Sequence, residues 1–290
     1  MVKRFLYLSI AVISLLAWEA KGQNRYAVLI GIGNYPEESG WSKIHGNNDI
    51  TIIKANLLRQ GFEENQIGTL IDSQATRQAI LQSFDQLSAR LVPGDVVYIH
   101  FSGHGQQITD LNGDEEDGYD EAWIPYDAGK VFEKGVYEGE HHLTDDELNA
   151  VLTKLRSRLG PKGKLVVVSD ACHSGSGSRR YVDDDVYIRG TADKFILPEG
   201  TPSADRKPGA TEWLFIAACK SYQSNYEYRT PAGEYYGILS YVIANDPQFF
   251  DQCRYLDLLK EWSRSVSDKS RYPQELDNEG QPCRKNAFMF

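Results

Sequence analysis

The sequence predicts an α/β protein whose mostly parallel central sheet is covered by helices on both faces. Two apolar, β-branched runs, residues 95–101 and 164–169, are typical of strands buried on both sides. Up to the first of these runs, strand-like and helix-like segments alternate as β-α-β-α-β, an order that favours parallel strands joined by crossover helices. The chain has 290 residues, of which 41% are hydrophobic and 25% charged, so it can form a packed core in a single domain.

Each element follows from a local pattern. Thr76 is an expected N-cap, and Thr144 with Glu147 forms a capping-box pattern, so each begins a helix. The expected strands are residues 25–32, 67–71, 95–101, 164–169 and 213–218, and the expected helices are residues 48–59, 76–91, 144–159, 235–245 and 255–267. We expect residues 109–139 to form an acidic loop and residues 176–210, rich in Gly, Ser, Pro, Arg and Asp, to form a long exposed loop.

The first residues resemble an export signal. Residues 1–22 begin with basic residues, continue with an apolar run too short to span a bilayer comfortably, and end in small residues that suit a signal peptidase. We expect cleavage near Gln23, which leaves residues 23–290 as the mature domain in the periplasm or outside the cell. The alternative is an uncleaved membrane anchor.

The charge of the mature chain excludes nucleic acid as a partner. Loss of three basic residues and one acidic residue with residues 1–22 moves the formal charge from −10 to −12. Such an acidic protein repels nucleic acid and anionic membranes, and no dense basic cluster offsets the repulsion. We therefore expect no membrane contact beyond export.

The four cysteines show no Cys-x-x-Cys spacing that would indicate zinc. Export permits disulfides, and Cys253 with Cys283 is the pair to test. Cys172 must stay reduced if it reacts.

Two short stretches carry the candidate chemistry. Ser102-Gly103-His104-Gly105 and Asp170-Ala171-Cys172-His173-Ser174-Gly175 each follow a predicted buried strand. Open parallel sheets place their chemistry beyond the carboxyl ends of their strands, so Cys172 is a candidate nucleophile and His104 its base. The N–H groups of Gly105 and Cys172 could stabilise an oxyanion. A lone Cys or His is more often a core residue, but the two together at strand ends favour catalysis.

With these motifs the sequence resembles the metacaspases among the caspase-type cysteine peptidases. The matching stretches are 26–32, 48–50, 102–105, 117–121, 144–148, 170–175, 217–219, 223–224 and 236–237. The resemblance implies a caspase-like three-layer α/β/α sandwich and a cysteine endopeptidase with Cys172 as nucleophile and His104 as base.

The resemblance also implies an acidic pocket for the residue before the cleaved bond. Metacaspases receive Arg or Lys there, and the matching positions are Asp49 and Asp170, with Ser102 nearby. Two buried acids repel each other and favour a cation between them, and the forked guanidinium of Arg fits a carboxylate better than an ammonium does. The expected partners are therefore peptides or proteins with Arg or Lys at the cleavage site. Asp49 could instead be only a favourable helix-start residue.

Calcium is the one cofactor that the resemblance implies, and no organic cofactor is expected. Residues 110–121 imitate part of an EF-hand loop, but Glu115 occupies the position that requires Gly, so an EF-hand is excluded. The positions that match calcium ligands of metacaspases are Asp120, Asp145 and Asp146. The last two would also be favoured without a metal in the first turn of a helix.

The segment after the nucleophile departs from the family. Metacaspases commonly supply a further aspartate there, whereas this chain has residues 178–180 as Ser-Arg-Arg, with Asp183 or Asp184 as candidate replacements. An enzyme that cuts after basic residues could also cut itself in this segment. Its basic residues are Arg179, Arg180, Arg189, Lys194, Arg206 and Lys207.

Two other functional hypotheses remain open. The chain could be a catalytically silent scaffold or binding protein with a caspase fold, or a peptidase of legumain-like or gingipain-like specificity. Caspases pair through a sheet edge and metacaspases are generally monomeric, so we expect a monomer.

Overall fold

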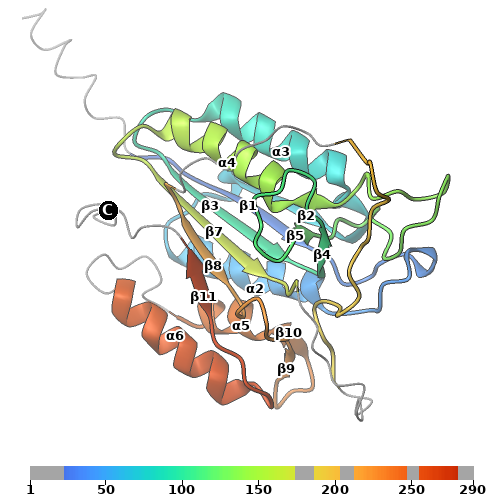
Figure 1. Ribbon diagram of the computed structural model, residues 1–290. Coiled ribbons are helices and arrows are strands. Elements are labelled where there is room, and N and C mark those ends of the chain that lie inside the picture. Colours follow the sequence, from blue (N-terminus) through green and yellow to red (C-terminus); the bar gives the residue numbers. More distant parts are fainter. Residues whose placement is uncertain (1–22, 174–185, 203–211, 247–254, 280–290) are drawn as a thin grey trace, which may run out of the picture.

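The computed structural model describes residues 23–173, 186–202, 212–246 and 255–279, and it is built around a six-stranded sheet (Figure 1). The strand order is β11-β8-β7-β3-β1-β2, and all neighbours are parallel except β11, which runs antiparallel to β8. The strands are β1 (Arg25–Gly31), β2 (Ile67–Ile71), β3 (Val96–Ser102), β7 (Lys164–Asp170), β8 (Leu214–Ala217) and β11 (Asp277–Glu279). The mostly parallel α/β fold is thus confirmed.

Helices cover both faces of the sheet. They are α2 (Gly46–Arg59), α3 (Arg77–Arg90), α4 (Asp145–Leu159), α5 (Ile238–Ala244) and α6 (Tyr255–Lys269). Successive strand residues point to opposite faces, so Val28 packs with α3 and α4 in one core, and Leu29 packs with α2, α5 and α6 in the other. The result is a three-layer sandwich.

Capping side chains begin two helices where the sequence places them. The Thr76 Oγ1 accepts a hydrogen bond from the Ala79 N–H at 3.2 Å, and the Thr144 Oγ1 accepts from the Glu147 N–H at 3.4 Å. Helix α2 differs, because it begins at Gly46, two residues before the expected start at residue 48.

Two smaller sheets were not predicted. They are formed by β4 (Gly105–Thr109), β5 (Tyr119–Trp123) and β6 (Leu143–Thr144), and by β9 (Glu227–Arg229) with β10 (Tyr235–Gly237). The expected loop at 109–139 therefore contains β5, and the helix expected from Tyr235 begins only at Ile238, because Tyr235–Gly237 pairs with β9. Single 3-10 turns lie at Glu37–Ser39, Glu64–Gln66 and Asp72–Gln74.

The long exposed loop expected at 176–210 is only partly exposed. Residues 186–202 are described, and within them Arg189, Thr191 and Phe195 are buried. The expectation is wrong at these three residues, because the segment pairs with two other parts of the chain, as described below.

Several predictions fall on residues outside the described ranges. They are the signal peptide at 1–22, the Cys253–Cys283 disulfide, residues 178–180, and Asp183 and Asp184 as substitute ligands. Among the described residues, no helix combines the length and the apolar character that a membrane crossing requires.

Candidate active site

The register of β3 and β7 brings the two catalytic candidates to the same edge of the sheet. The two strands are parallel, and Ser102 pairs with Asp170. His104 and Cys172 each follow this pair by two residues. At Gly105 the backbones approach so closely that a Cβ atom would lie 2.6 Å from the Cys172 carbonyl oxygen, so this position requires glycine.

His104 is a neutral imidazole with one free ring nitrogen. Its Nε2 lies 2.9 Å from the carbonyl oxygen of Ser42, and since a carbonyl only accepts, the proton must be on Nε2. The Nδ1 atom is buried and has no hydrogen-bond partner among the described residues, so its lone pair is available. The imidazole stacks on Trp41 at 4.8 Å between ring centroids, and burial lowers its pKa to about 4. The ring is therefore uncharged at neutral pH.

The Cys172 thiol donates to a backbone carbonyl. Its Sγ lies 2.7 Å from the carbonyl oxygen of Gln223, and the Sγ of Cys219 lies 3.4 Å from the same oxygen. Both cysteines are buried thiols that take no part in a disulfide. A hydrogen bond with Cys172, together with burial, raises the pKa of the Cys219 thiol.

The chain itself lies across this site. The segment at 187–189 runs antiparallel to residues 225–227, with the Arg189 N–H donating to the Asn225 carbonyl at 2.9 Å and the Glu227 N–H donating to the Tyr187 carbonyl at 3.1 Å. The carbonyl oxygen of Arg189 accepts from the Cys172 N–H at 2.8 Å and from the Gly105 N–H at 3.4 Å. These are the two donors expected for an oxyanion.

Beyond Arg189 the segment continues along β4. Gly190 forms a bridge with Gly105, and the Phe195 N–H donates to the Gln107 carbonyl at 2.8 Å. A Cβ atom on Gly190 would lie 2.2 Å from the Cys172 carbonyl oxygen. The Arg189–Gly190 peptide is therefore held from both sides next to Cys172.

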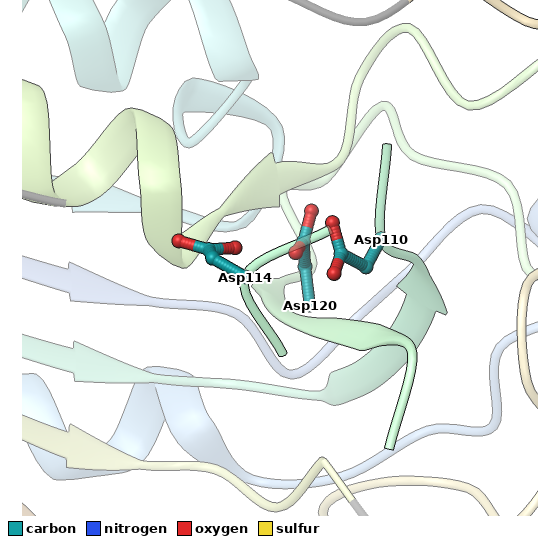
Figure 2. A group of neighbouring side chains, drawn as sticks. All are labelled: Asp110, Asp114 and Asp120. Atoms are coloured by element: carbon teal, nitrogen blue, oxygen red, sulfur yellow. The ribbon is translucent and has the colours of Figure 1, made fainter. Parts of the chain in front are cut away.

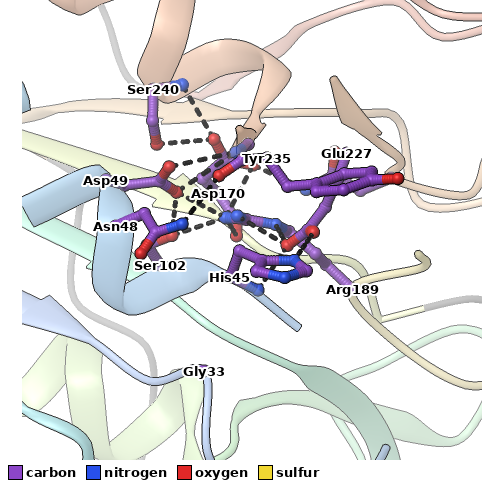
Figure 3. A network of polar contacts seen from close by, with 12 residues as sticks. Gly33, His45, Asn48, Asp49, Ser102, Asp170, Arg189, Glu227, Tyr235 and Ser240 are labelled. Atoms are coloured by element: carbon purple, nitrogen blue, oxygen red, sulfur yellow. Dashed lines mark hydrogen bonds and ion pairs between the residues drawn. The ribbon is translucent and has the colours of Figure 1, made fainter. Parts of the chain in front are cut away.

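The Arg189 side chain fills the expected acidic pocket (Figure 3). Its Nη1 donates to Asp49 Oδ2 at 2.8 Å and to the Ser102 hydroxyl, and it lies 3.6 Å from Asp170 Oδ1. Its Nε and Nη2 donate to Glu227 Oε1 at 3.1 and 2.9 Å. All four charged side chains are completely buried. The structure thus brings Asp49, Ser102 and Asp170 together around a guanidinium.

The pocket carboxylates respond differently to burial. Burial raises the pKa of Asp49 to about 7, although Arg189 opposes the shift. Burial also acts to raise the pKa of Asp170, but Arg189 and hydrogen bonds from Asn225 and Ser240 outweigh it, so this pKa is lowered. The pKa of Glu227 is lowered in the same way, by Arg189 and His45 acting against burial. Three acids share one guanidinium, so the pocket strongly favours a cation.

A second group of acids lies at the turn between β4 and β5 (Figure 2). Carboxylate oxygens of Asp110, Asp114 and Asp120 all lie within 4.8 Å of one another. Asp145 and Asp146 lie nearby at the start of α4. Burial, followed by the charges of Asp145, Asp110, Asp146 and Asp114, raises the pKa of Asp120 to about 8. Backbone N–H groups of Asn112, Gly113 and Glu115 donate to Asp110 and hold its pKa below the usual value. The clustered carboxylate oxygens are donors that fit a hard cation such as calcium.

A cavity connects the two regions. Its volume is about 450 Å³, and its lining includes Asp114, Asp145 and Asp146 at one part and Cys172 and Cys219 at another.

Comparison with known proteins identifies the family. Residues 25–178, more than half of the chain, match the family described as metacaspase, peptidase C14 domain. The chain belongs to the metacaspase family. Among curated relatives, Metacaspase-1 of Eremothecium gossypii is 37% identical over 161 residues, which are 53% of this chain and 32% of that protein. Metacaspase-1 of Botryotinia fuckeliana is 36% identical over 52% of this chain and 35% of that protein.

The matched part thus spans about a third of the length of these metacaspases. Among solved structures, the crystal structure of protein GSU0716 from Geobacter sulfurreducens superposes with a TM-score of 0.59 over 91% of this chain and 96% of that chain, at 20% identity. This likeness concerns the fold alone. The metacaspase resemblance stated from the motifs is confirmed.

Sequence reasoning missed several residues of this metacaspase site. Arg189 was only one of six basic residues in its segment, and Glu227 carried no motif. Asn225 and Glu227 are two residues apart in a stretch that follows Gln223. If that stretch is extended, both side chains point to the same face, and this spacing is the signal that could have indicated them. In the sequence, Asp110 and Asp114 stand out only within the EF-hand-like stretch 110–121.

Proposed function

We propose that this chain is a cysteine endopeptidase that cleaves peptide bonds after Arg or Lys. The observation that carries the proposal is the position of Arg189, whose guanidinium contacts Asp49 while its carbonyl oxygen accepts from the Cys172 N–H. Arg189 here stands in for the arginine of a substrate. The adjoining backbone is paired with residues 225–227 as a bound peptide strand would be.

The residues supply a complete acyl-transfer route. The His104 Nδ1 takes the proton of the Cys172 thiol, and the thiolate attacks the carbonyl carbon of the bound arginine. The N–H groups of Cys172 and Gly105 stabilise the oxyanion that forms. The proton on Nδ1 passes to the leaving amine, and water then hydrolyses the thioester with His104 again as base. In the present arrangement the thiol proton points to Gln223, so Cys172 must rotate before it reacts.

Self-processing belongs to the same proposal. Two basic residues of the segment, Arg189 and Lys194, lie in the described ranges, and of these Arg189 contacts both the acidic pocket and the oxyanion donors. We expect hydrolysis of the Arg189–Gly190 bond, which would let Arg189 leave the pocket. An external substrate can enter only after Arg189 has moved.

Calcium activation is also proposed. Asp110, Asp114 and Asp120, with Asp145 and Asp146 beside them, would hold the ion, which would neutralise the repulsion among these acids. The ligand set would thus draw on both the acidic turn and the start of α4. Binding there would reshape one end of the cavity that Cys172 lines.

Export and a monomeric state remain proposals as well. Export is supported by the basic, apolar and small-residue pattern of residues 1–22. Mass spectrometry of the protein recovered from its host would reveal a mature N-terminus near Gln23, and light scattering would give the oligomeric state.

The deciding experiment uses matched fluorogenic peptides that end in Arg, Lys, Asp or Asn, with calcium or with a chelator. The Cys172→Ala protein is the control, and the intact mass of both proteins is followed during incubation. We expect cleavage after Arg and Lys, and a break after Arg189, only in the unmodified protein with calcium.

The alternatives predict other outcomes. Cleavage after Asn or Asp would favour a different specificity. An intact chain without peptidase activity under all conditions would favour the silent scaffold, in which Arg189 permanently fills the pocket.

A further inference from the structure

Glu227 is a third carboxylate in the pocket, and no sequence motif pointed to it. It is the first residue of β9, and its side chain is completely buried. Its Oε1 accepts hydrogen bonds from the Nε and Nη2 atoms of Arg189. Glu227 thus contacts the edge of the guanidinium opposite the one that contacts Asp49 and Ser102 (Figure 3).

The two edges of the guanidinium differ in whether a lysine side chain could supply the same donor. The Nη1 edge, at Asp49, requires only a cationic nitrogen at the end of the side chain, which Arg and Lys both possess. The Nε–H edge, at Glu227, exists only in arginine. A lysine ammonium sits where arginine has its Cζ atom and has no donor at the Nε position.

Glu227 is held in this orientation by contacts independent of Arg189. The His45 N–H donates to Oε1 at 2.7 Å, and the His45 Nδ1 lies 2.6 Å from Oε2. The His45 ring is itself fixed, since it stacks on Tyr235 of β10 at 4.9 Å. The carboxylate is therefore already aimed at the Nε position when a side chain enters the pocket.

We infer that Glu227 is a specificity-determining residue that makes this site prefer Arg over Lys, through its contact with Nε–H. The inference rests on the proposed function, with Arg189 standing in for a substrate arginine. A bound lysine would place a single ammonium at the Cζ position, so Glu227 would lose the paired, charge-assisted hydrogen bonds from Nε and Nη2. His45 acts as a positioning residue for Glu227.

The first test compares Arg and Lys within one protein sample. Two peptides that differ only in this residue compete for the calcium-loaded full chain, and the ratio of their kcat/KM values is measured. This ratio does not depend on the fraction of protein that is folded. In Glu227→Gln we expect the Arg-to-Lys ratio to fall about tenfold or more, because the charge-assisted bonds to Nε and Nη2 are weakened.

The matched control is Glu234→Gln on the same hairpin. Glu234 is exposed, and its carboxylate accepts from Tyr236 Oη at 3.3 Å outside the pocket. Its Arg-to-Lys ratio is expected to stay at the unmodified value.

A second measurement needs no variant. The unmodified protein is given a peptide whose cleavage-site residue is an amidine in which CH2 replaces the Nε–H of arginine. The cation and its terminal nitrogens are kept, and only the donor to Glu227 is lost. We expect kcat/KM about tenfold or more below that of the arginine peptide.

The outcomes separate this inference from the proposed function. If Arg and Lys peptides are both cleaved, but their ratio is unchanged in Glu227→Gln or the amidine reacts as well as arginine, the role of Glu227 is refuted and the peptidase proposal stands. If the unmodified protein cleaves after neither Arg nor Lys, the proposed function fails, and this inference fails with it.

Discussion

Replacement of Arg189 by Met would test the charge balance of the pocket. The change keeps most of the side-chain volume but removes the one cation shared by Asp49, Asp170 and Glu227. Loss of one partner from a buried ion cluster typically costs about 3–5 kcal/mol, because the remaining charges stay desolvated. We expect a loss of this size at pH 8 in the free energy of unfolding.

The loss should shrink as the pH falls. Burial opposes ionisation of Asp170 and Glu227, and Arg189 is a main reason why their pKa values are nevertheless lowered. Without Arg189 these values rise above those of the unfolded chain, about 3.9 for Asp and 4.3 for Glu. The folded variant then binds more protons than the unfolded chain. Its free energy of unfolding therefore decreases as the pH rises from about 4 through the raised pKa values of the two acids. The difference from the parent protein is largest at pH 8 and smallest at pH 5.

The assay is urea unfolding followed by tryptophan fluorescence at pH 5 and pH 8. Urea is preferred because guanidinium could itself enter the pocket. Both proteins carry Cys172→Ala so that self-cleavage does not interfere. The exposed Arg264→Met, on α6 away from the pocket, serves as control and should change stability by less than about 0.5 kcal/mol. An equal loss at both pH values, or a loss below about 1 kcal/mol at pH 8, would refute the reasoning.

Three further predictions concern the remaining parts of the site. Burial lowers the pKa of His104 to about 4, so the acid limb of kcat at saturating peptide should lie near that value. Trp41→Ala, which exposes the ring, should move this limb toward 6.5, and an unmoved limb would contradict the assignment. Burial and neighbouring acids raise the pKa of Asp120 to about 8, so its charged form destabilises the folded chain at pH 8. Asp120→Asn should therefore raise Tm in chelator at pH 8 and reduce the gain in Tm on adding calcium. A full gain in Tm with calcium would exclude Asp120 as a ligand. Gly190→Ala places a Cβ atom 2.2 Å from a Cys172 backbone oxygen and should slow self-cleavage, followed by intact mass, and an unchanged rate would show that this segment is not held as described.

The fold could be predicted wherever local patterns and tertiary packing agree. The threonine caps of α3 and α4 and the β-branched runs of β3 and β7 each determine an element with little help from the rest of the chain. Tyr235–Gly237 shows the opposite case. Its residues continue an apolar pattern into α5, but a ladder with Glu227–Arg229 holds them extended, and that pairing has no signature within the segment.

The same distinction explains what could be predicted of the site. Asp49, Ser102, His104, Asp170 and Cys172 lie at or near strand ends or helix starts, and the parallel register of β3 and β7 is sufficient to gather most of them. Nothing in the sequence distinguishes Arg189 from the other basic residues of its segment. Its position depends on the pairing of residues 187–189 with 225–227, which joins two irregular stretches that local propensity does not define.

Charge explains why residues 187–189 pair with residues 225–227 in this register. Asp49, Asp170 and Glu227 come from three separate elements and would repel one another in a closed pocket, so the folded chain needs a buried cation there. Arg189 meets this need and at the same time aligns its own carbonyl with the Cys172 and Gly105 N–H groups. A group that stabilises the pocket therefore also blocks it, and a peptide can enter only by supplying an equivalent cation. The stability that Arg189 gives the pocket and the proposed preference of the site for basic residues thus have the same electrostatic origin.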